Sequence, residues 1–215
     1  DLQIPNTGRI SRADLAMIGH DGLVPADLFS DLDFPLVVRP VGSHAGRNLE
    51  LLRSPADVQE YLGTCVDPEF FVSSYIDYRS RDGAFRKYRI VLVNGEPFAC
   101  HMAIADQWKV WYMNAGMAEA PEKRDEERRF MQRFEAEFQS RHRETFLEMS
   151  RSVGLDYFGI DCAENPNGEL VVFEADNALI VHDMDSVSVF PYKRQQMRKI
   201  FSAFDQMLRL TSQTG

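Results

Sequence analysis

Two apolar segments joined by a turn constrain the fold of this chain more than any other feature of its sequence. Residues 154–163 and 170–177 are apolar and rich in residues that favour β-strands. Between them, residues 165–168 (Asn-Pro-Asn-Gly) are a strong turn signal. The pattern predicts a β-hairpin, and we expect Glu164 to pair with Glu169 across its turn.

This register would gather acidic side chains on one face of the hairpin. Asp161 would lie opposite Val172. Because strand side chains alternate between faces, Glu174 and Asp176 would then share the face of Asp161 and Val172. Carboxylates among apolar strands repel one another, and a Mg²⁺ ion that also binds substrate phosphates would resolve this conflict. The alternative is a half-exposed hairpin whose acidic residues simply face solvent.

A second segment combines a cation with a glycine loop. Residues 33–40 have the pattern of a short apolar strand with Arg39 near its end, and the loop that follows contains Gly42 and Gly46. The backbone N–H groups of such a loop can meet phosphate oxygens. It is neither a P-loop nor a dinucleotide fingerprint, since no helix follows it. On its own it is more often a plain turn.

A third segment, residues 85–102, predicts a hairpin that turns at Asn94-Gly95. Alternation along its first strand places Lys87 and Arg89 on one face. Two cations on an apolar strand repel each other unless anions lie between them. The alternative is a charged edge strand that resists aggregation, but the apolar residues that follow favour a central strand.

Composition narrows the class of protein. With 215 residues, 44% of them hydrophobic, the chain can bury one good core or two small lobes. A net charge of −9 without a long basic run argues against a nucleic-acid partner, and no apolar run is long enough to predict a membrane span. Three widely spaced cysteines without a Cys-x-x-Cys pair favour a reduced, cytoplasmic setting over disulfides or a zinc site.

Helical patterns fill much of the remaining sequence. Short helices are expected near residues 11–19 and 54–63, a long amphipathic helix over 122–153, and a closing helix over 191–210. We expect the apolar stripe of the long helix to pack in its own core rather than bind a partner. The stripe consists of Phe130, Phe134, Phe138, Phe146 and Met149.

The order of these segments resembles the ATP-grasp superfamily, which contains ATP-dependent carboxylate–amine ligases similar to glutathione synthase and glutamate ligases. The resemblance runs from about Ile4 to about Asp185 and implies an α+β fold with nucleotide held between two lobes built on antiparallel sheets. Two residues depart from the family pattern. Arg39 stands where lysine is usual, and Asp176 stands where asparagine is commoner. Both keep the needed chemistry, a cation for phosphate and an oxygen ligand for metal.

The resemblance also implies roles for particular residues. The glycine loop would cover the phosphates, the strand near residue 74 would be the hinge that reads adenine and ribose, and Asp82 is the alternative to Asp77 at the ribose. The implied set is Lys87 and Arg89 as catalytic cations; Arg39, Ser43, His44 and Gly46 at the phosphates; Ser74, Tyr75, Ile76 and Asp77 at the hinge; and Asp161, Glu174 and Asp176 as metal ligands.

The implied reaction is ADP-forming ligation of a small-molecule or peptide carboxylate to an amine or thiol through an acylphosphate, with ATP and one or two Mg²⁺ ions, or Mn²⁺ in their place. The expected domains are a lead-in of residues 1–19, a small lobe of residues 20–75 and a large lobe of residues 76–215. Family members normally carry a further N-terminal domain, so we expect a fragment, and a homodimer is left open. The alternative is a non-catalytic nucleotide-sensing domain of a larger protein.

Overall fold

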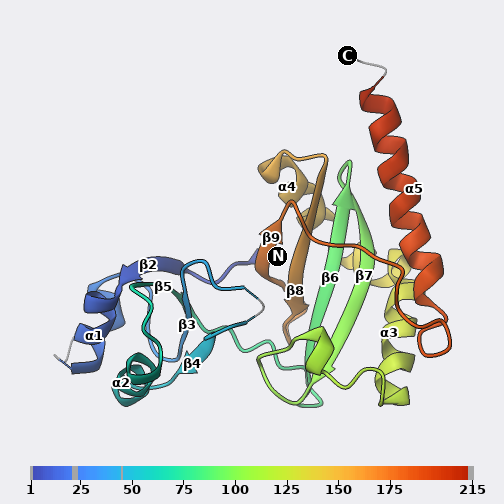
Figure 1. Ribbon diagram of the computed structural model, residues 1–215. Helices are drawn as coiled ribbons and strands as arrows, with labels where there is room; N and C mark the ends of the chain where they lie inside the picture. Colours follow the sequence, from blue (N-terminus) through green and yellow to red (C-terminus); the bar gives the residue numbers. More distant parts are fainter. Residues whose placement is uncertain (1, 21–23, 45, 213–215) are drawn as a thin grey trace. The chain divides into compact units, whose positions relative to one another are not determined.

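The computed structural model describes residues 2–20, 24–44 and 46–212, which form two compact units (Figure 1). The small unit is Ile4–Asp77. The large unit consists of the described residues from Tyr78 onward together with the short strand β1 (Leu2–Gln3). Much of the predicted lead-in thus belongs to the fold of the small unit. Both units combine helices with a sheet, which confirms the predicted α+β class.

The small unit is a four-stranded antiparallel sheet in the order β2-β5-β3-β4 with two helices packed against it. Helix α2 begins where the sequence predicts, because Ser54 caps it by accepting a hydrogen bond from the Asp57 N–H. The elements of the small unit are β2 (Thr7–Ser11), α1 (Arg12–His20), β3 (Leu36–Pro40), β4 (Glu50–Leu52), α2 (Pro55–Thr64) and β5 (Glu69–Ser74). The helices bury Leu15, Ile18 and Val58 in one core with Val38 and Phe70 of the sheet.

The large unit is built on a five-stranded sheet in the order β1-β9-β8-β6-β7. Both predicted hairpins are present, since β6 pairs with β7 and β8 pairs with β9, each antiparallel. β1 pairs with β9 in parallel, so the sheet is mixed rather than purely antiparallel. The strands are β6 (Phe85–Val93), β7 (Glu96–Ala105), β8 (Tyr157–Glu164) and β9 (Leu170–Asp176).

The register of the β8–β9 hairpin differs from the predicted one. Glu164 pairs with Leu170 rather than Glu169, and a β-bulge between Asp161 and Cys162 then brings Asp161 opposite Glu174 instead of Val172. The turn is held by Asn165, whose side chain accepts the N–H groups of residues 167 and 169. Because a bulge shifts alternation by one residue, Glu174 still shares a face with Asp161 whereas Val172 does not.

The predicted long helix over residues 122–153 is interrupted. Helix α3 (Pro121–Arg133) passes into a π-helical segment (Glu135–Gln139), and α4 (Arg143–Val153) follows after a turn. The Gln139 N–H donates to the Phe134 carbonyl in the wider turn of a π-helix. The expected core role of the aromatic stripe is confirmed, because Phe138 is buried against Tyr88 of β6.

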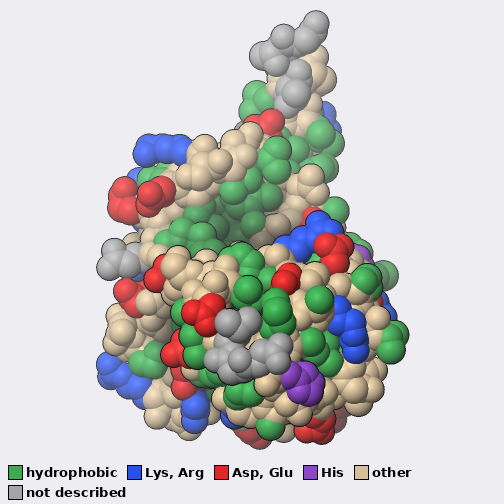
Figure 2. All heavy atoms as spheres, turned by 90° about the vertical axis from the view of Figure 1, so that its left-hand side faces the viewer, with side chains coloured by type: hydrophobic (Ala, Val, Ile, Leu, Met, Phe, Trp, Pro, Cys, Tyr) green, Lys and Arg blue, Asp and Glu red, His purple; other side chains and the backbone are tan. Residues whose placement is uncertain are grey.

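The two faces of the large-unit sheet are covered differently. The α3–α4 segment packs on the face that carries Tyr88. Helix α5 (Lys193–Thr211) packs on the opposite face, where the Phe204 ring contacts Tyr157, and the chain from β9 to α5 crosses in front of the strands (Figure 1). Helix α5 exposes Phe201, Leu208 and Leu210, and hydrophobic side chains gather on the surface near the C-terminal end of the chain (Figure 2). Within the described residues, no helix is long and apolar enough to cross a membrane.

Candidate nucleotide and metal site

The two predicted catalytic cations lie on the sheet face that α5 only partly covers, and an anion lies between them. Lys87 Nζ is 2.9 Å from Asp161 Oδ2, and Arg89 contacts both carboxylate oxygens, with Nε 2.8 Å from Oδ1. The Asp161 side chain is only 5% exposed. The repulsion expected between the cations is therefore offset by one buried carboxylate.

Electrostatics keep this carboxylate ionised. Burial alone would raise the pKa of Asp161, but the hydrogen bonds from Arg89 and the charge of Lys87 lower that pKa to about 2. For Arg89, burial would lower the pKa of the guanidinium, whereas its pairing with Asp161 raises it. The three residues thus carry two positive charges and one negative charge, and Glu174 on the neighbouring strand is a second carboxylate close enough to act on Arg89.

The site residues form one row across the sheet. His101, Arg89, Asp161 and Glu174 are successive cross-strand partners on β7, β6, β8 and β9. A register shift interrupts the β6–β7 pair just after Arg89, and another interrupts the β8–β9 pair at Asp161. Bulges of this kind often re-aim side chains next to active sites. Below, this set of four residues is called the cross-sheet row.

The remaining predicted metal ligands, Glu174 and Asp176, differ in exposure and in hydrogen bonding. Glu174 is exposed and makes no hydrogen bond or ion pair with any described residue. Asp176 is partly buried, and its Oδ1 accepts the Ala178 N–H at 2.8 Å. It lies opposite Gly159, where a Cβ atom would clash with the Leu179 side chain. This close contact fixes the chain just beyond Asp176.

The donor set fits a magnesium ion that is bound together with phosphates. Among the described residues, no three His, Cys, Asp or Glu side chains lie close enough to form a metal cage of their own. Asp161 and Glu174 are direct neighbours, and Mg²⁺ typically uses one or two carboxylates and takes phosphate oxygens as further ligands. The assignment of Asp161, Glu174 and Asp176 as metal ligands stays a prediction.

The predicted phosphate-binding loop lies in the small unit. Arg39 on β3 is exposed, its guanidinium lies 4.8 Å from the Phe71 ring centroid, and its NH1 group donates to the Ser43 carbonyl. Ser43 is buried and His44 is exposed. Gly46 has a φ of 70°, which a residue with a side chain rarely adopts. The loop therefore turns tightly around its glycines, and its contact with phosphate stays a prediction.

The predicted hinge lies at the end of the small unit. The Ser74 N–H donates to the Asn6 carbonyl and the Tyr75 N–H donates to the Pro35 carbonyl, so both backbone donors are already used. Ile76 and Asp77 are the last residues of this unit. The other ribose candidate, Asp82, is in the large unit, where it pairs with Arg86 at 2.7 Å. The assembly of hinge, loop and cross-sheet row into one nucleotide site stays a prediction.

A buried polar cluster beside the cross-sheet row was not predicted from the sequence, where residues 122–153 indicated only an amphipathic helix. Glu127 is fully buried and accepts hydrogen bonds from the Tyr192 hydroxyl at 2.6 Å and from the Met102 N–H of the edge strand β7. Lys193 Nζ lies 3.4 Å from Glu127 and 3.0 Å from Asp185. One signal was available: Glu127 precedes Met131, Phe134 and Phe138 at helical spacing, on the same apolar stripe.

Tyr112 connects this cluster to the row. Its hydroxyl lies within hydrogen-bond distance of both Glu127 oxygens and of Lys193 Nζ, and its ring packs on His101 with centroids 4.5 Å apart. His101 was not predicted as a site residue, because its only signal, a place on β7 across from Arg89, depends on the register of the hairpin.

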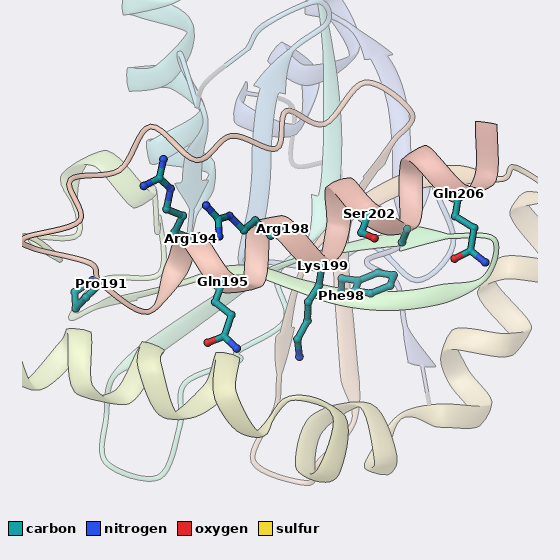
Figure 3. Close-up of a pocket in the computed structure, with 9 residues that line it drawn as sticks. Phe98, Pro191, Arg194, Gln195, Arg198, Lys199, Ser202 and Gln206 are labelled. Carbon is teal, nitrogen blue, oxygen red and sulfur yellow. The ribbon is translucent and has the colours of Figure 1, made fainter. Parts of the chain in front are cut away.

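An open groove runs along α5 beside Phe98 of β7 (Figure 3). It is lined in part by Arg194, Arg198 and Lys199, and Figure 3 shows Arg194 and Lys199 pointing to opposite sides of the helix. Arg194 and Lys199 each pair with a carboxylate. None of the predicted site residues lines this groove.

Neither a protein-family model nor a curated protein sequence matches this chain. Solved structures do match it. The D-alanine–D-alanine ligase from Bacillus anthracis superposes with a TM-score of 0.54 at 15% identity over 99% of this chain and 64% of that one. The VanG D-Ala:D-Ser ligase from Enterococcus faecalis superposes with a TM-score of 0.51 at 14% identity over 94% of this chain and 57% of that one.

The chain spans less than two thirds of the length of these two ligases. At such low identity the likeness shows the fold alone. Together with the order of strands and helices, the likeness confirms the fold that the motif order predicted. This chain has the ATP-grasp fold.

Proposed function

We propose that this chain is the nucleotide-binding and catalytic module of an ADP-forming ligase that joins a carboxylate to an amine. The observation that carries the proposal is the pairing of the buried Asp161 with the half-buried cations Lys87 and Arg89, with Glu174 beside them. The two cations would bind the phosphates of a nucleotide, and the neighbouring pair of carboxylates would bind its metal ion. The two ligases with the same fold support this reaction class.

The proposed reaction has two steps. The substrate carboxylate attacks the γ-phosphorus of ATP, ADP leaves, and an acylphosphate forms. The amine then attacks the acyl carbon, a proton leaves the nitrogen, and inorganic phosphate departs. Neither step needs a nucleophile from the protein, so the residues act by positioning and by neutralising charge.

The residues of the large unit would divide this work. Lys87 and Arg89 would hold oxygens of the transferred phosphoryl group, and Asp161 would keep both cations in place until the nucleotide arrives. Asp161 and Glu174, with Asp176, would hold Mg²⁺, which neutralises phosphate charge when bound. In the small unit, Arg39 and the loop of Ser43, His44 and Gly46 would contact phosphates.

A non-catalytic nucleotide sensor is the second candidate. The arginine at position 39, where the family pattern has lysine, favours it. Against it stands Glu174, an exposed carboxylate that bonds to no described residue and lies near two half-buried cations. The proposal therefore gives preference to the ligase.

The test is ADP release by the chain with MgATP and a panel of amino acids and dipeptides that supplies both carboxylate and amine. The matched structures are named for D-alanine and D-serine, which makes these two amino acids the first to test. ADP release that requires both substrates supports the ligase. Nucleotide binding without release across the panel favours the sensor, and a failure to bind ATP would count against both.

A further inference from the structure

His101 is the member of the cross-sheet row that the proposed function leaves unused. It lies directly across from Arg89 in the register of β6 and β7. Cross-strand partners point to the same face, with Cβ atoms roughly 5 Å apart. His101 therefore lies beside the guanidinium that is proposed to hold phosphate, on the side away from Asp161.

The imidazole of His101 has no hydrogen-bond partner in the part of the chain that the structure describes. His101 makes no hydrogen bond or ion pair with any described residue, although it is partly buried. The ring nitrogens of His101 are not among the described polar side-chain atoms that are shut off from solvent and lack a hydrogen bond. The ring nitrogens of His101 therefore keep some contact with solvent, next to Arg89 in the β6–β7 pair.

The ring of His101 is held by packing, but its nitrogens form no hydrogen bond with the described residues. One side of the ring packs on Tyr112, whose hydroxyl is tied to Glu127 and Lys193. Burial lowers the pKa of His101 well below its usual range, and the charges of Arg89 and Lys193 lower it further. A neutral imidazole carries one N–H donor and one acceptor nitrogen.

We propose that His101 is a further substrate-contacting residue of this site, which donates a hydrogen bond to an oxyanion that Arg89 holds. This oxyanion is a phosphate oxygen of the nucleotide or the carboxylate of the substrate, since both present the same acceptor. Tyr112 is then a positioning residue, because it holds the ring in place through Glu127 and Lys193. The inference depends on the proposed function, because that function places an anion at Arg89.

The first test measures the affinity of the full chain for MgADP, for magnesium with the non-hydrolysable ATP analogue AMPPNP, and for adenosine. If the oxyanion is a phosphate oxygen, His101→Leu should weaken AMPPNP binding by about tenfold, because a hydrogen bond to a charged oxygen is lost. If it is the substrate carboxylate, the same loss should appear in the binding of D-alanine to the MgADP-bound chain. His101→Gln, which keeps an N–H donor, should recover part of the loss. His20→Leu is the matched control, since His20 is exposed and lies in the small unit. Adenosine should bind all variants alike.

The second test uses the histidine ring protons in NMR spectra, with the His101 signal identified by its absence in His101→Gln. The signal should shift with AMPPNP and less with MgADP if the oxyanion is the terminal phosphate. It should shift only with D-alanine added to MgADP if the oxyanion is a substrate carboxylate. No shift under any of these conditions, in protein that binds nucleotide, would overturn the proposal.

The positioning role is tested by a double-mutant cycle. Tyr112→Leu should weaken the binding of whichever ligand His101→Leu affects, AMPPNP or D-alanine, but add little in the His101→Leu background, because both changes remove the same contact. Additive effects would mean that Tyr112 acts only on the fold. If the wild type binds no nucleotide at all, the proposed function fails. If the wild type binds nucleotide, and His101→Leu binds both AMPPNP and D-alanine with wild-type affinity, only the inference about His101 fails.

Discussion

Replacing Lys193 with methionine should destabilise the large unit strongly. Lys193 is 4% exposed and Glu127 is fully buried, so the substitution leaves a carboxylate without its counter-ion inside the protein. Breaking a buried ion pair by removing one partner typically costs about 3–5 kcal/mol. The melting temperature should fall by roughly 10 °C, since each kcal/mol shifts a domain of this size by about 2–4 °C.

The loss should depend on pH. Burial raises the pKa of Glu127 in the folded protein, and the charge of Lys193 opposes that rise. A carboxyl group with a raised folded pKa contributes most stability below its unfolded pKa and loses that contribution as the pH rises through the folded value. Without Lys193 the folded pKa rises further. Lys193→Met should therefore be more destabilising at pH 8 than at pH 5.5.

Urea unfolding followed by tryptophan fluorescence measures this directly, because Trp108 and Trp111 are the two tryptophans and both belong to the large unit. Lys199→Met is the matched control on the same helix, since Lys199 and Glu135 form an exposed pair that contributes at most about 1 kcal/mol. The double variant Glu127→Gln/Lys193→Met should regain part of the stability. A loss below about 1 kcal/mol for Lys193→Met, or one that does not change with pH, would refute the reasoning.

Three further predictions concern ligands. Saturating MgATP should raise the melting temperature, because a ligand at one hundred times its Kd adds about 2.7 kcal/mol; an unchanged transition at millimolar MgATP contradicts nucleotide binding. Glu174→Gln should keep the melting temperature of the free chain, since Glu174 is exposed and unbonded, and should abolish ADP release; full activity at matched Mg²⁺ removes Glu174 from the site. Arg39→Ala should raise the Kd for ATP about tenfold, and Arg39→Lys should recover part of it; equal affinities in calorimetry mean that Arg39 is only a surface charge.

Local signals predicted the hairpins well and their register less well. Asn94-Gly95 and the turn at residues 165–168 both close antiparallel pairs in the structure. The bulge between Asp161 and Cys162 was not predictable from these turns, because a single extra residue is compatible with the same apolar pattern. The grouping of Glu174 with Asp161 survived only because the one-residue error at the turn and the bulge compensate each other.

Buried polar groups were the harder part of the site to predict. Charges of both signs along residues 122–153 indicated a solvated helix face. The apolar residues recur at helical spacing through this whole range, so they did not reveal the π-helical segment within it. Glu127 is buried where partners from three other segments converge on it: Met102, Tyr112, and the adjacent residues Tyr192 and Lys193. Such convergence depends on tertiary packing, which sequence periodicity does not encode.

The pairing of Asp161 with Lys87 and Arg89 determines which variants can report on function. Asp161 is the resting counter-ion of both cations, so Asp161→Asn would disturb the ligand-free fold as well as any bound anion. A loss of activity in that variant would therefore have two explanations. Glu174, one strand away in the same row, has no such double duty, and the effect of its substitution can be attributed to the ligand alone.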